Sequence, residues 1–330
     1  MHVPQSLQDD LPRYFYPGGL DVVNLGDCRA FMLSEDNLYH VCVPEEFRHF
    51  PLDFHYSSIS QQGYQPSPVS AANIHLVKPA RYGVYLILHH MIQAGIAPSF
   101  LDVGAYVGDV GLRYGNFFRT IGYNGRVFCF DPSLAGTLIP YNIALNGLEP
   151  YVEHRPQAVS DFSGLITFEQ KQGHADSACS TSPGAGYPNT IVPCVKLSEF
   201  INKQKIQSAF IKLDTENLEI RILADINSFL LETPSVVCFE CHGHETALFP
   251  VMSKLLETHY LFDVGYLPRP FCFTPVTPDT LQDLQAKIRQ YKYGYTDILA
   301  ISRRMPGVAE LVNKLAELKS EPAAYSLIMT

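Results

Sequence analysis

The segment Phe100-Leu-Asp-Val-Gly-Ala-Tyr-Val-Gly108 decides the fold class of this chain. Residues 100–103 are apolar apart from Asp102, as in a buried strand. Glycines at 104, 108 and 111 allow a tight turn, after which the first N–H groups of a helix would face an anion. The segment therefore predicts a strand-loop-helix unit that binds a ligand. An ordinary strand-to-helix turn is the alternative interpretation.

The spacing of these glycines argues against a dinucleotide ligand. Dinucleotide sites carry a Gly-x-Gly-x-x-Gly pattern, in which the second glycine lets the backbone approach the pyrophosphate. That position is Tyr106 in this chain. The looser pattern suits a ligand without pyrophosphate, such as S-adenosylmethionine (SAM), whose methionine carboxylate and ammonium can meet backbone N–H groups and a carboxylate.

An acidic residue follows the next predicted strand. This strand, residues 127–130, ends immediately before Asp131. An acid at the carboxyl end of the second strand lies beside the glycine loop and can accept hydrogen bonds from both hydroxyls of a ribose. The sequence thus predicts a nucleoside-containing ligand. A solvated turn aspartate before Pro132 is the alternative.

Strand-like and helix-like segments alternate outward from this unit, which predicts an α/β fold with a mostly parallel sheet covered by helices on both faces. Residues 79–95 read as an apolar helix that delivers the chain to the first strand. The predicted strands are residues 100–103, 127–130, 153–158, 210–213, 236–240, 261–264 and 298–301.

We predict two parts, an N-terminal accessory segment (residues 1–75) and a ligand-binding domain (residues 76–330). The accessory segment is rich in Pro, Tyr and Phe, and its stretches 30–33 and 38–43 around a polar separator fit a β-hairpin. It would serve as a lid, as a carbohydrate-stacking surface, or as packing against the sheet or a second subunit of a homodimer. A small, polar loop at 173–186 would close over the ligand or form plain surface.

Composition narrows the class of partner. Hydrophobic residues make up 46% of the 330 residues and charged residues 17%, as in a packed globular protein. The net charge of −9, with scattered Lys and Arg, gives no expectation of nucleic-acid binding. The first residues lack a signal-peptide pattern and no window reaches the roughly 18 apolar residues of a membrane span, so we expect a cytoplasmic protein without membrane contact. The eight dispersed cysteines are expected to be reduced.

Between roughly residues 98 and 265 the chain resembles the FkbM family of class I SAM-dependent methyltransferases. The resemblance rests on ordered motifs: Leu-Asp-Val-Gly-Ala105, Phe-Asp-Pro-Ser133, Asn142-Ile-Ala-Leu-Asn146, Gln157-Ala-Val-Ser-Asp161, Val195-Lys-Leu-Ser-Glu-Phe200, Phe210-Ile-Lys-Leu-Asp-Thr-Glu-Asn217 and Val236-Val-Cys-Phe-Glu-Cys-His242. Asn217 departs from the family pattern, which usually has Gly after this Glu.

The resemblance implies a Rossmann-like, mostly parallel seven-stranded sheet with an antiparallel final hairpin strand, and SAM as the cofactor. It implies cofactor contacts for Asp102, Gly104, Ala105, Tyr106, Gly108, Asp131, Pro132, Ser133, Ala158, Val159 and Asp214. Asp214 and Glu216 would face the centre of methyl transfer. Family members typically methylate hydroxyl groups on sugars or secondary metabolites, which implies O-methylation of a small-molecule acceptor.

A hydroxyl acceptor has to lose its proton, and a nearby carboxylate or imidazole can take it as a general base. Candidates cluster after two predicted strands: Asp214 and Glu216 after one, Glu240, His242 and His244 at the other. We favour Asp214 or His242 as the base. Capping of the next helix is the alternative role for Asp214, and backbone hydrogen bonding in a loop is the alternative for each histidine.

Two other chemistries are weaker. The acids and histidines would also suit a divalent metal, but one residue between two histidines is a weak signal, and we predict no metal. Cys238-Phe-Glu-Cys241-His242 matches the haem-attachment pattern, yet it lies in a predicted strand and no secretion signal precedes it. A non-catalytic binding protein and, less favoured, a nicotinamide-linked oxidoreductase remain as alternatives to the methyltransferase.

Overall fold

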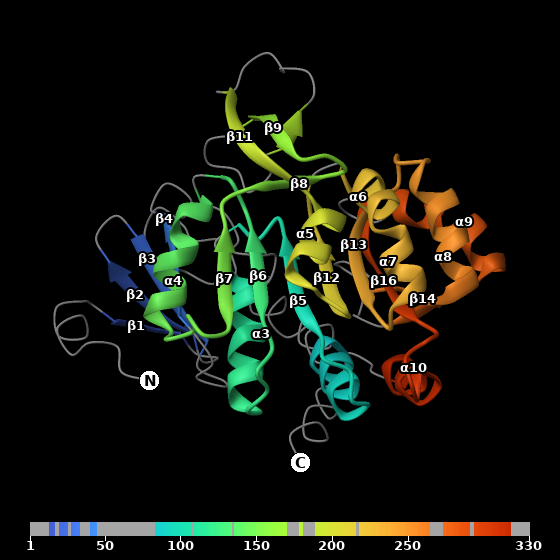
Figure 1. Ribbon diagram of the computed structural model, residues 1–330, viewed down its shortest axis with the longest axis horizontal. Coiled ribbons are helices and arrows are strands. Elements are labelled where there is room, and N and C mark those ends of the chain that lie inside the picture. The colour runs from blue at the N-terminus through green and yellow to red at the C-terminus, as the bar shows by residue number, and fades with distance from the viewer. Residues whose placement is uncertain are drawn as a thin grey trace. The chain divides into compact units, whose positions relative to one another are not determined.

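A computed structural model gives the fold of the chain (Figure 1). It describes residues 13–16, 20–25, 28–33, 40–44, 83–106, 108–133, 135–169, 178–180, 189–215, 218–264, 273–290 and 294–317. The chain divides into two compact units. Met1–Ile74, Phe100–Ala158 and Ser163–Cys194 belong to the first unit, and His75–Ser99, Val159–Phe162 and Val195–Thr330 belong to the second.

The predicted α/β fold is confirmed. Among the described residues the largest sheet has eight strands, in the order β15-β14-β16-β13-β12-β5-β6-β7. The strand beyond the expected seven is β15 (Thr274–Val276), a short edge strand. Two of its three residues are exposed. The strand therefore has no apolar run from which the sequence could predict it.

The first unit contains three parallel strands: β5 (Ser99–Val103), β6 (Val127–Phe130) and β7 (Val152–Arg155). Each residue of β6 is buried, as expected for a parallel strand that is covered on both faces. Helix α3 (Asp109–Thr120) packs against β6 and β7, and α4 (Ile139–Leu145) packs against β7 (Figure 1).

One predicted strand is split in the structure. Residues 153–158 were expected to be continuous, but β7 ends at Arg155 and β8 (Ala158–Ser160) begins a new strand. The residue between them that breaks the ladder is Pro156, which has no N–H to donate. The N–H of Gln157 turns back to the carbonyl of Arg155 at 2.7 Å. The backbone therefore leaves the line of β7 at this proline.

Asp102 ties β5 to the start of α3. Its side chain is fully buried, and Oδ2 accepts a hydrogen bond from the N–H of Gly111 at 2.9 Å. Gly108, the N-cap residue, provides no side-chain cap, so a strand carboxylate supplies the acceptor that a capping residue normally gives. This arrangement requires the first turn of α3 to lie close to the sheet.

Helix α3 lies very close to β6 at Gly111. A Cβ atom at this position would lie 2.2 Å from Sγ of Cys129. In an open helix Gly→Ala stabilises by about 1 kcal/mol. Here we expect Gly111→Ala to lower the free energy of unfolding by about 1–3 kcal/mol, because the added methyl group would overpack the core. Urea unfolding measures the change.

The matched test combines Gly111→Ala with Cys129→Ala, which removes the clashing sulfur. The double variant should recover most of the stability that Gly111→Ala loses, relative to Cys129→Ala alone. Equal losses from Gly111→Ala with and without the sulfur would show that this contact does not limit the position of α3.

The second unit is built on β12 (Ala209–Leu213) and β13 (Val236–His242), which are parallel. Strand β16 (Tyr295–Ser302) lies between β13 and β14 (His259–Asp263) and is antiparallel to both. The antiparallel final hairpin strand is thus present. Among the described residues after position 195, the unit's helices are α5 (Leu197–Gln204), α6 (Glu219–Asp225), α7 (Asn227–Glu232), α8 (Leu248–Thr258), α9 (Pro278–Arg289) and α10 (Val308–Glu317).

The predicted helix at 79–95 is described over residues 83–93. Ile87, Leu88 and Met91 have no exposed surface, which explains the apolar pattern. The helix is followed by a turn in which Gly95 has φ +75°, a conformation that glycine adopts without strain. Among the described residues, no helix has the length and apolar character that a membrane span needs.

The N-terminal segment contains the predicted hairpin. Strands β3 (Cys28–Leu33) and β4 (His40–Pro44) pair antiparallel, within a sheet that also contains β1 (Arg13–Tyr16) and β2 (Leu20–Leu25). Strand β4 contacts α4. The role of the segment and its boundary at residue 75 stay predictions.

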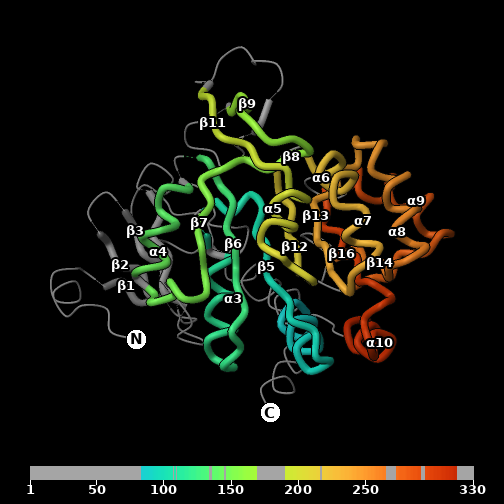
Figure 2. The backbone as a smooth tube through the Cα atoms, in the orientation of Figure 1, coloured from blue at the N-terminus to red at the C-terminus, as the bar shows by residue number. Residues whose placement is uncertain are grey.

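A further antiparallel sheet was not predicted. Strand β9 (Gly164–Glu169) pairs with β10 (Ala178–Ser180) and with β11 (Asn189–Lys196). Figure 2 shows β9 and β11. Ile166, Phe168 and Val192 are buried, whereas Leu165 and Ile191 are about 70% exposed. This alternation with period two was the available signal. Most of the predicted mobile loop at 173–186 lies outside the described residues.

Candidate functional site

In the glycine loop of the first unit, every second residue from 104 to 108 has a left-handed backbone conformation. Gly104 has φ +78°, Tyr106 φ +53° and Gly108 φ +83°. For tyrosine this region is strained, and strain of this kind persists where the surroundings hold the backbone in place. The position at which a dinucleotide site has its second glycine thus has a glycine-like backbone here, but it bears a tyrosine side chain.

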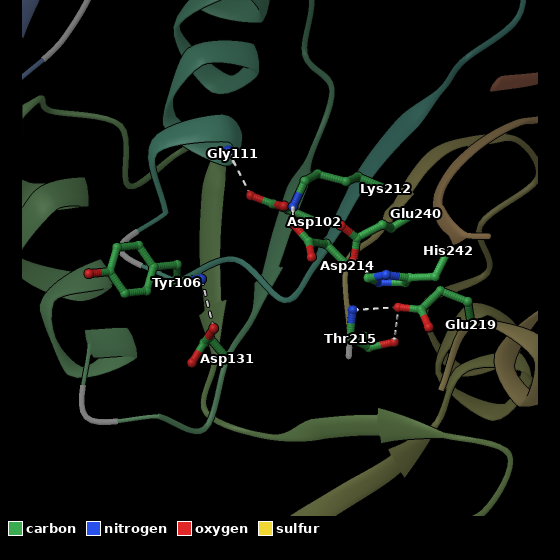
Figure 3. A network of polar contacts seen from close by, with 10 residues as sticks. All are labelled: Asp102, Tyr106, Gly111, Asp131, Lys212, Asp214, Thr215, Glu219, Glu240 and His242. Atoms are coloured by element: carbon green, nitrogen blue, oxygen red, sulfur yellow. Dashed lines mark hydrogen bonds and ion pairs between the residues drawn. The ribbon is translucent and has the colours of Figure 1, made fainter. Parts of the chain in front are cut away.

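Asp131 is the residue that holds Tyr106 in place. Asp131 is 8% exposed, and its Oδ2 accepts the N–H of Tyr106 at 2.7 Å (Figure 3). Its Oδ1 accepts the N–H of Ser133 at 2.8 Å. A carboxylate oxygen can accept more than one hydrogen bond. The solvated-turn interpretation of Asp131 is therefore wrong, since this carboxylate organises the loop.

The N–H groups of the loop are directed to acceptors of the protein itself. Those of Gly104 and Ala105 both donate to the carbonyl of Phe130 at 3.0 Å, and that of Gly108 donates to Ala105 at 2.7 Å. The sequence suggested that such groups would meet a ligand. The structure instead uses them to shape the loop, which leaves the Asp131 carboxylate as the polar group best placed to receive donors.

Two neighbours of Asp131 were missed by sequence reasoning. Gly136 leaves room beside it, because a Cβ atom there would lie 2.7 Å from the Asp131 carbonyl oxygen and 2.9 Å from Oδ1. His154 of β7 donates from Nε2 to the same carbonyl at 3.2 Å. Burial lowers the pKa of His154, and this hydrogen bond opposes the shift. Neither residue belongs to a recognisable local motif.

The other predicted cofactor residues lie near these contacts or in buried strands. Ala105, Ser133, Ala158 and Val159 are buried, and Pro132 is half-buried. Asp102 has no exposed surface and contacts Gly111. Their contacts with a ligand stay predictions.

In the second unit, Asp214 follows β12 and is paired with a cation. Lys212 Nζ donates to Asp214 Oδ2 at 3.0 Å, and the Asp214 side chain is 47% exposed (Figure 3). The alternative role as a helix cap is not seen: α6 has Leu218 as its N-cap and no side-chain cap bond. Glu216 and Asn217 lie outside the described residues.

Glu219 fixes the backbone next to Asp214. It is 2% exposed, and Oε1 accepts both the N–H of Thr215 at 2.6 Å and its hydroxyl at 2.8 Å. Burial raises the pKa of Glu219, while the two bonds from Thr215 oppose the shift. The spacing of four residues between Thr215 and Glu219 was a signal that sequence reasoning did not use.

Strand β13 brings Glu240 and His242 together. His242 Nε2 lies 3.1 Å from Glu240 Oε2, and the side chains are 20% and 12% exposed (Figure 3). The backbone N–H of His242 donates to Glu245 at 3.0 Å. The rings of His244 and Tyr295 lie 5.1 and 5.3 Å from the His242 ring. The loop interpretation of His242 is therefore wrong, because it ends a strand.

The metal and haem chemistries that the sequence raised can be examined only among the described residues. Within the described ranges, no three His, Cys, Asp or Glu side chains are placed to hold a metal ion. Cys241 is buried, and Cys238 is half-buried on the opposite face of β13. Burial raises the pKa of both thiols well above the ordinary value, which keeps them protonated and unreactive.

Several solved structures are similar to this chain. The crystal structure of methyltransferase FkbM from Methylobacillus flagellatus KT is 11% identical, with a TM-score of 0.39, over 62% of this chain and 43% of that chain. Precorrin-6y C5,15-methyltransferase from Geobacter metallireducens GS-15 is 11% identical, with a TM-score of 0.34, over 78% of this chain and 99% of that chain. A COG1565 superfamily member from Burkholderia thailandensis, bound to S-adenosyl-homocysteine, is 10% identical, with a TM-score of 0.27, over 70% and 78%.

The chain thus spans less than half of the Methylobacillus protein. No curated protein matches it. The family model of the methyltransferase FkbM domain matches residues 102–268, which is just over half of the chain and includes the glycine loop, Asp131 and strands β12 and β13. On this match, the chain belongs to the FkbM methyltransferase domain family.

Proposed function

We propose that the protein transfers a methyl group from SAM to a hydroxyl group of a small molecule, such as a sugar or a secondary metabolite. Membership of the family supports methyl transfer. The main support for SAM as the cofactor is the Asp131 carboxylate. It is buried at the carboxyl end of β6 and held by two backbone N–H groups.

The residues around Asp131 fit SAM. The carboxylate would accept the ribose hydroxyls of the cofactor, and Gly136 leaves space beside it. The loop at Tyr106 offers no second glycine to a pyrophosphate, and its N–H is already bound to Asp131. SAM, when bound, supplies an electrophilic methyl group. The protein has to exclude water, align the acceptor oxygen and remove its proton.

The function is tested by calorimetric titration of the protein with SAM, with its demethylated product S-adenosylhomocysteine (SAH) and with NAD. We expect micromolar binding of SAM and SAH and no binding of NAD. Binding of NAD would favour an oxidoreductase, and binding of none of the three would overturn the cofactor assignment. SAH binding without methyl transfer to any of a broad panel of hydroxylated acceptors would favour a non-catalytic binding protein.

Gly136→Ala tests the space beside Asp131. The new Cβ would meet a backbone carbonyl, which cannot swing aside, so the Asp131 turn must shift. We expect a roughly tenfold weaker affinity for SAH, equivalent to about 1.4 kcal/mol. Gly147→Ala is the control, because a Cβ there meets nothing within 4 Å although φ is +59°. Equal SAH affinities in both variants would show that the space is not used.

A further inference from the structure

The less buried face of β13 presents a row of polar side chains. Cys238, Glu240 and His242 alternate with buried residues along the strand. On β12, Lys212 pairs in register with Cys238, and on β16 Asp297 and Tyr295 pair with Glu240 and His242. The row therefore contains the imidazole of His242, and the rings of His244 and Tyr295 lie 5.1 and 5.3 Å from it.

The Glu240 contact selects one tautomer of His242. A carboxylate can only accept hydrogen bonds, so at 3.1 Å the Nε2 atom of neutral His242 must carry the proton. The other nitrogen, Nδ1, is then left with its lone pair. Nδ1 has no hydrogen-bond partner within the described part of the chain. The imidazole is thus oriented by an acid and has one nitrogen ready to accept a proton.

Asp214, the other candidate base, is arranged differently. Its Oδ2 is paired with the Lys212 ammonium at 3.0 Å, and its side chain is 47% exposed. One of its carboxylate oxygens is thus occupied by an ammonium group, and no acid among the described residues orients it. The ion pair of Asp214 with Lys212 involves no imidazole. The geometry distinguishes two candidates that the sequence left equal.

We propose that His242 is the general base of the methyl transfer and that Glu240 is its positioning residue; this rests on the proposed function. The proton of the acceptor hydroxyl moves to Nδ1 of His242. The electron pair of the oxygen forms the bond to the methyl carbon, and the pair of the broken carbon–sulfur bond stays on sulfur, which becomes the thioether of SAH. Glu240 stabilises the imidazolium that results.

The first test measures the tautomer directly, by NMR of the full-length protein with ¹⁵N-labelled histidine and no added ligand. The His242 signal is the one missing from His242→Gln. We expect the neutral ring to be protonated at Nε2 almost exclusively. Glu240→Gln keeps an acceptor oxygen and should retain this tautomer, whereas Glu240→Leu should give a mixture. Protonation at Nδ1 in the native protein, or no change in Glu240→Leu, would overturn the proposal.

The second test measures SAH formation from SAM with a panel of methyl glycosides of hexoses and 6-deoxyhexoses. For any acceptor that reacts, we expect His242→Gln to lower kcat by 10²–10⁴-fold, with SAH affinity within twofold of the native value. His89→Gln, at an exposed histidine, is the control. A larger loss in Asp214→Asn than in His242→Gln would assign the base to Asp214 instead.

The two tests separate the failure of this proposal from the failure of the proposed function. A protein that binds no SAH overturns the proposed function whatever the tautomer of His242. A protein that binds SAH but has Nδ1 protonated retains the cofactor and loses only the assigned base. If no glycoside reacts, the tautomer measurement alone decides the proposal.

Discussion

Asp131→Ala is expected to abolish SAH binding in a calorimetric titration, with an affinity at least 100-fold weaker than that of the native protein. The carboxylate would accept two ribose hydroxyls, and hydrogen bonds to a charged group contribute about 1.5–3 kcal/mol each. The same change removes the acceptor for the Tyr106 N–H, a bond of 2.7 Å that holds a left-handed tyrosine in place. The loop is therefore expected to relax as well as to lose the ligand contact.

Three further measurements show which of these effects dominates. Thermal unfolding should show that Asp131→Ala still folds, since the core strand β6 ends before this residue. Asp131→Asn keeps one acceptor oxygen but places a donor amide against one of the two N–H groups, so it should also bind SAH weakly. Asp279→Ala, at an acid in the first turn of α9, should bind as the native protein does. Native affinity in Asp131→Ala would remove the basis of the cofactor assignment.

The parts of the fold that were predictable from sequence are those in which local pattern and tertiary position agree. Strand β6 was predicted with its observed bounds, because four buried apolar residues directly precede a charged one. Asp131 was predictable for the same reason, since its place is fixed by the end of that strand. The break at Pro156 was missed because a short β-prone run continued on both sides of it.

The contacts of the site depend on register, which the sequence does not specify. His154 reaches Asp131 only because β7 lies beside β6. The ion pair between Asp214 and Lys212 requires both side chains to lie on the same side of the end of β12. Sequence reasoning could name the acids and histidines, but it could not tell which of them carries a partner.

His259 is expected to make the protein less stable in acid. It begins β14 with no exposed surface, and burial lowers its pKa to about 4, with Arg303 adding to the effect. In the unfolded chain the pKa of histidine is about 6.5. Between pH 4 and pH 6.5, the imidazole is therefore protonated in the unfolded state but not in the native state. The stability contributed by neutral His259 is complete above pH 6.5 and falls as the pH drops towards 4.

The size of this effect follows from the shift. A difference of about 2.5 pKa units at 1.36 kcal/mol each gives a loss of roughly 3 kcal/mol between pH 7 and pH 4. Urea unfolding across this range measures it, and His259→Leu removes the titrating group. Other groups titrate in the same window, Glu219 with the opposite sign because its pKa is raised, so the informative quantity is the difference between the two proteins.

We expect the native protein and His259→Leu to differ in how their stability depends on pH. The unfolding free energy of the native protein should drop by roughly 3 kcal/mol more than that of His259→Leu between pH 7 and pH 4, whatever the variant's stability at neutral pH. His89→Gln, at an exposed histidine, should follow the native curve. Parallel curves for the native protein and His259→Leu would mean that the imidazole is protonated in the fold. In that case the contact between Nδ1 and the Thr258 hydroxyl at 2.9 Å would involve a charged ring, and β14 would begin at a solvated site.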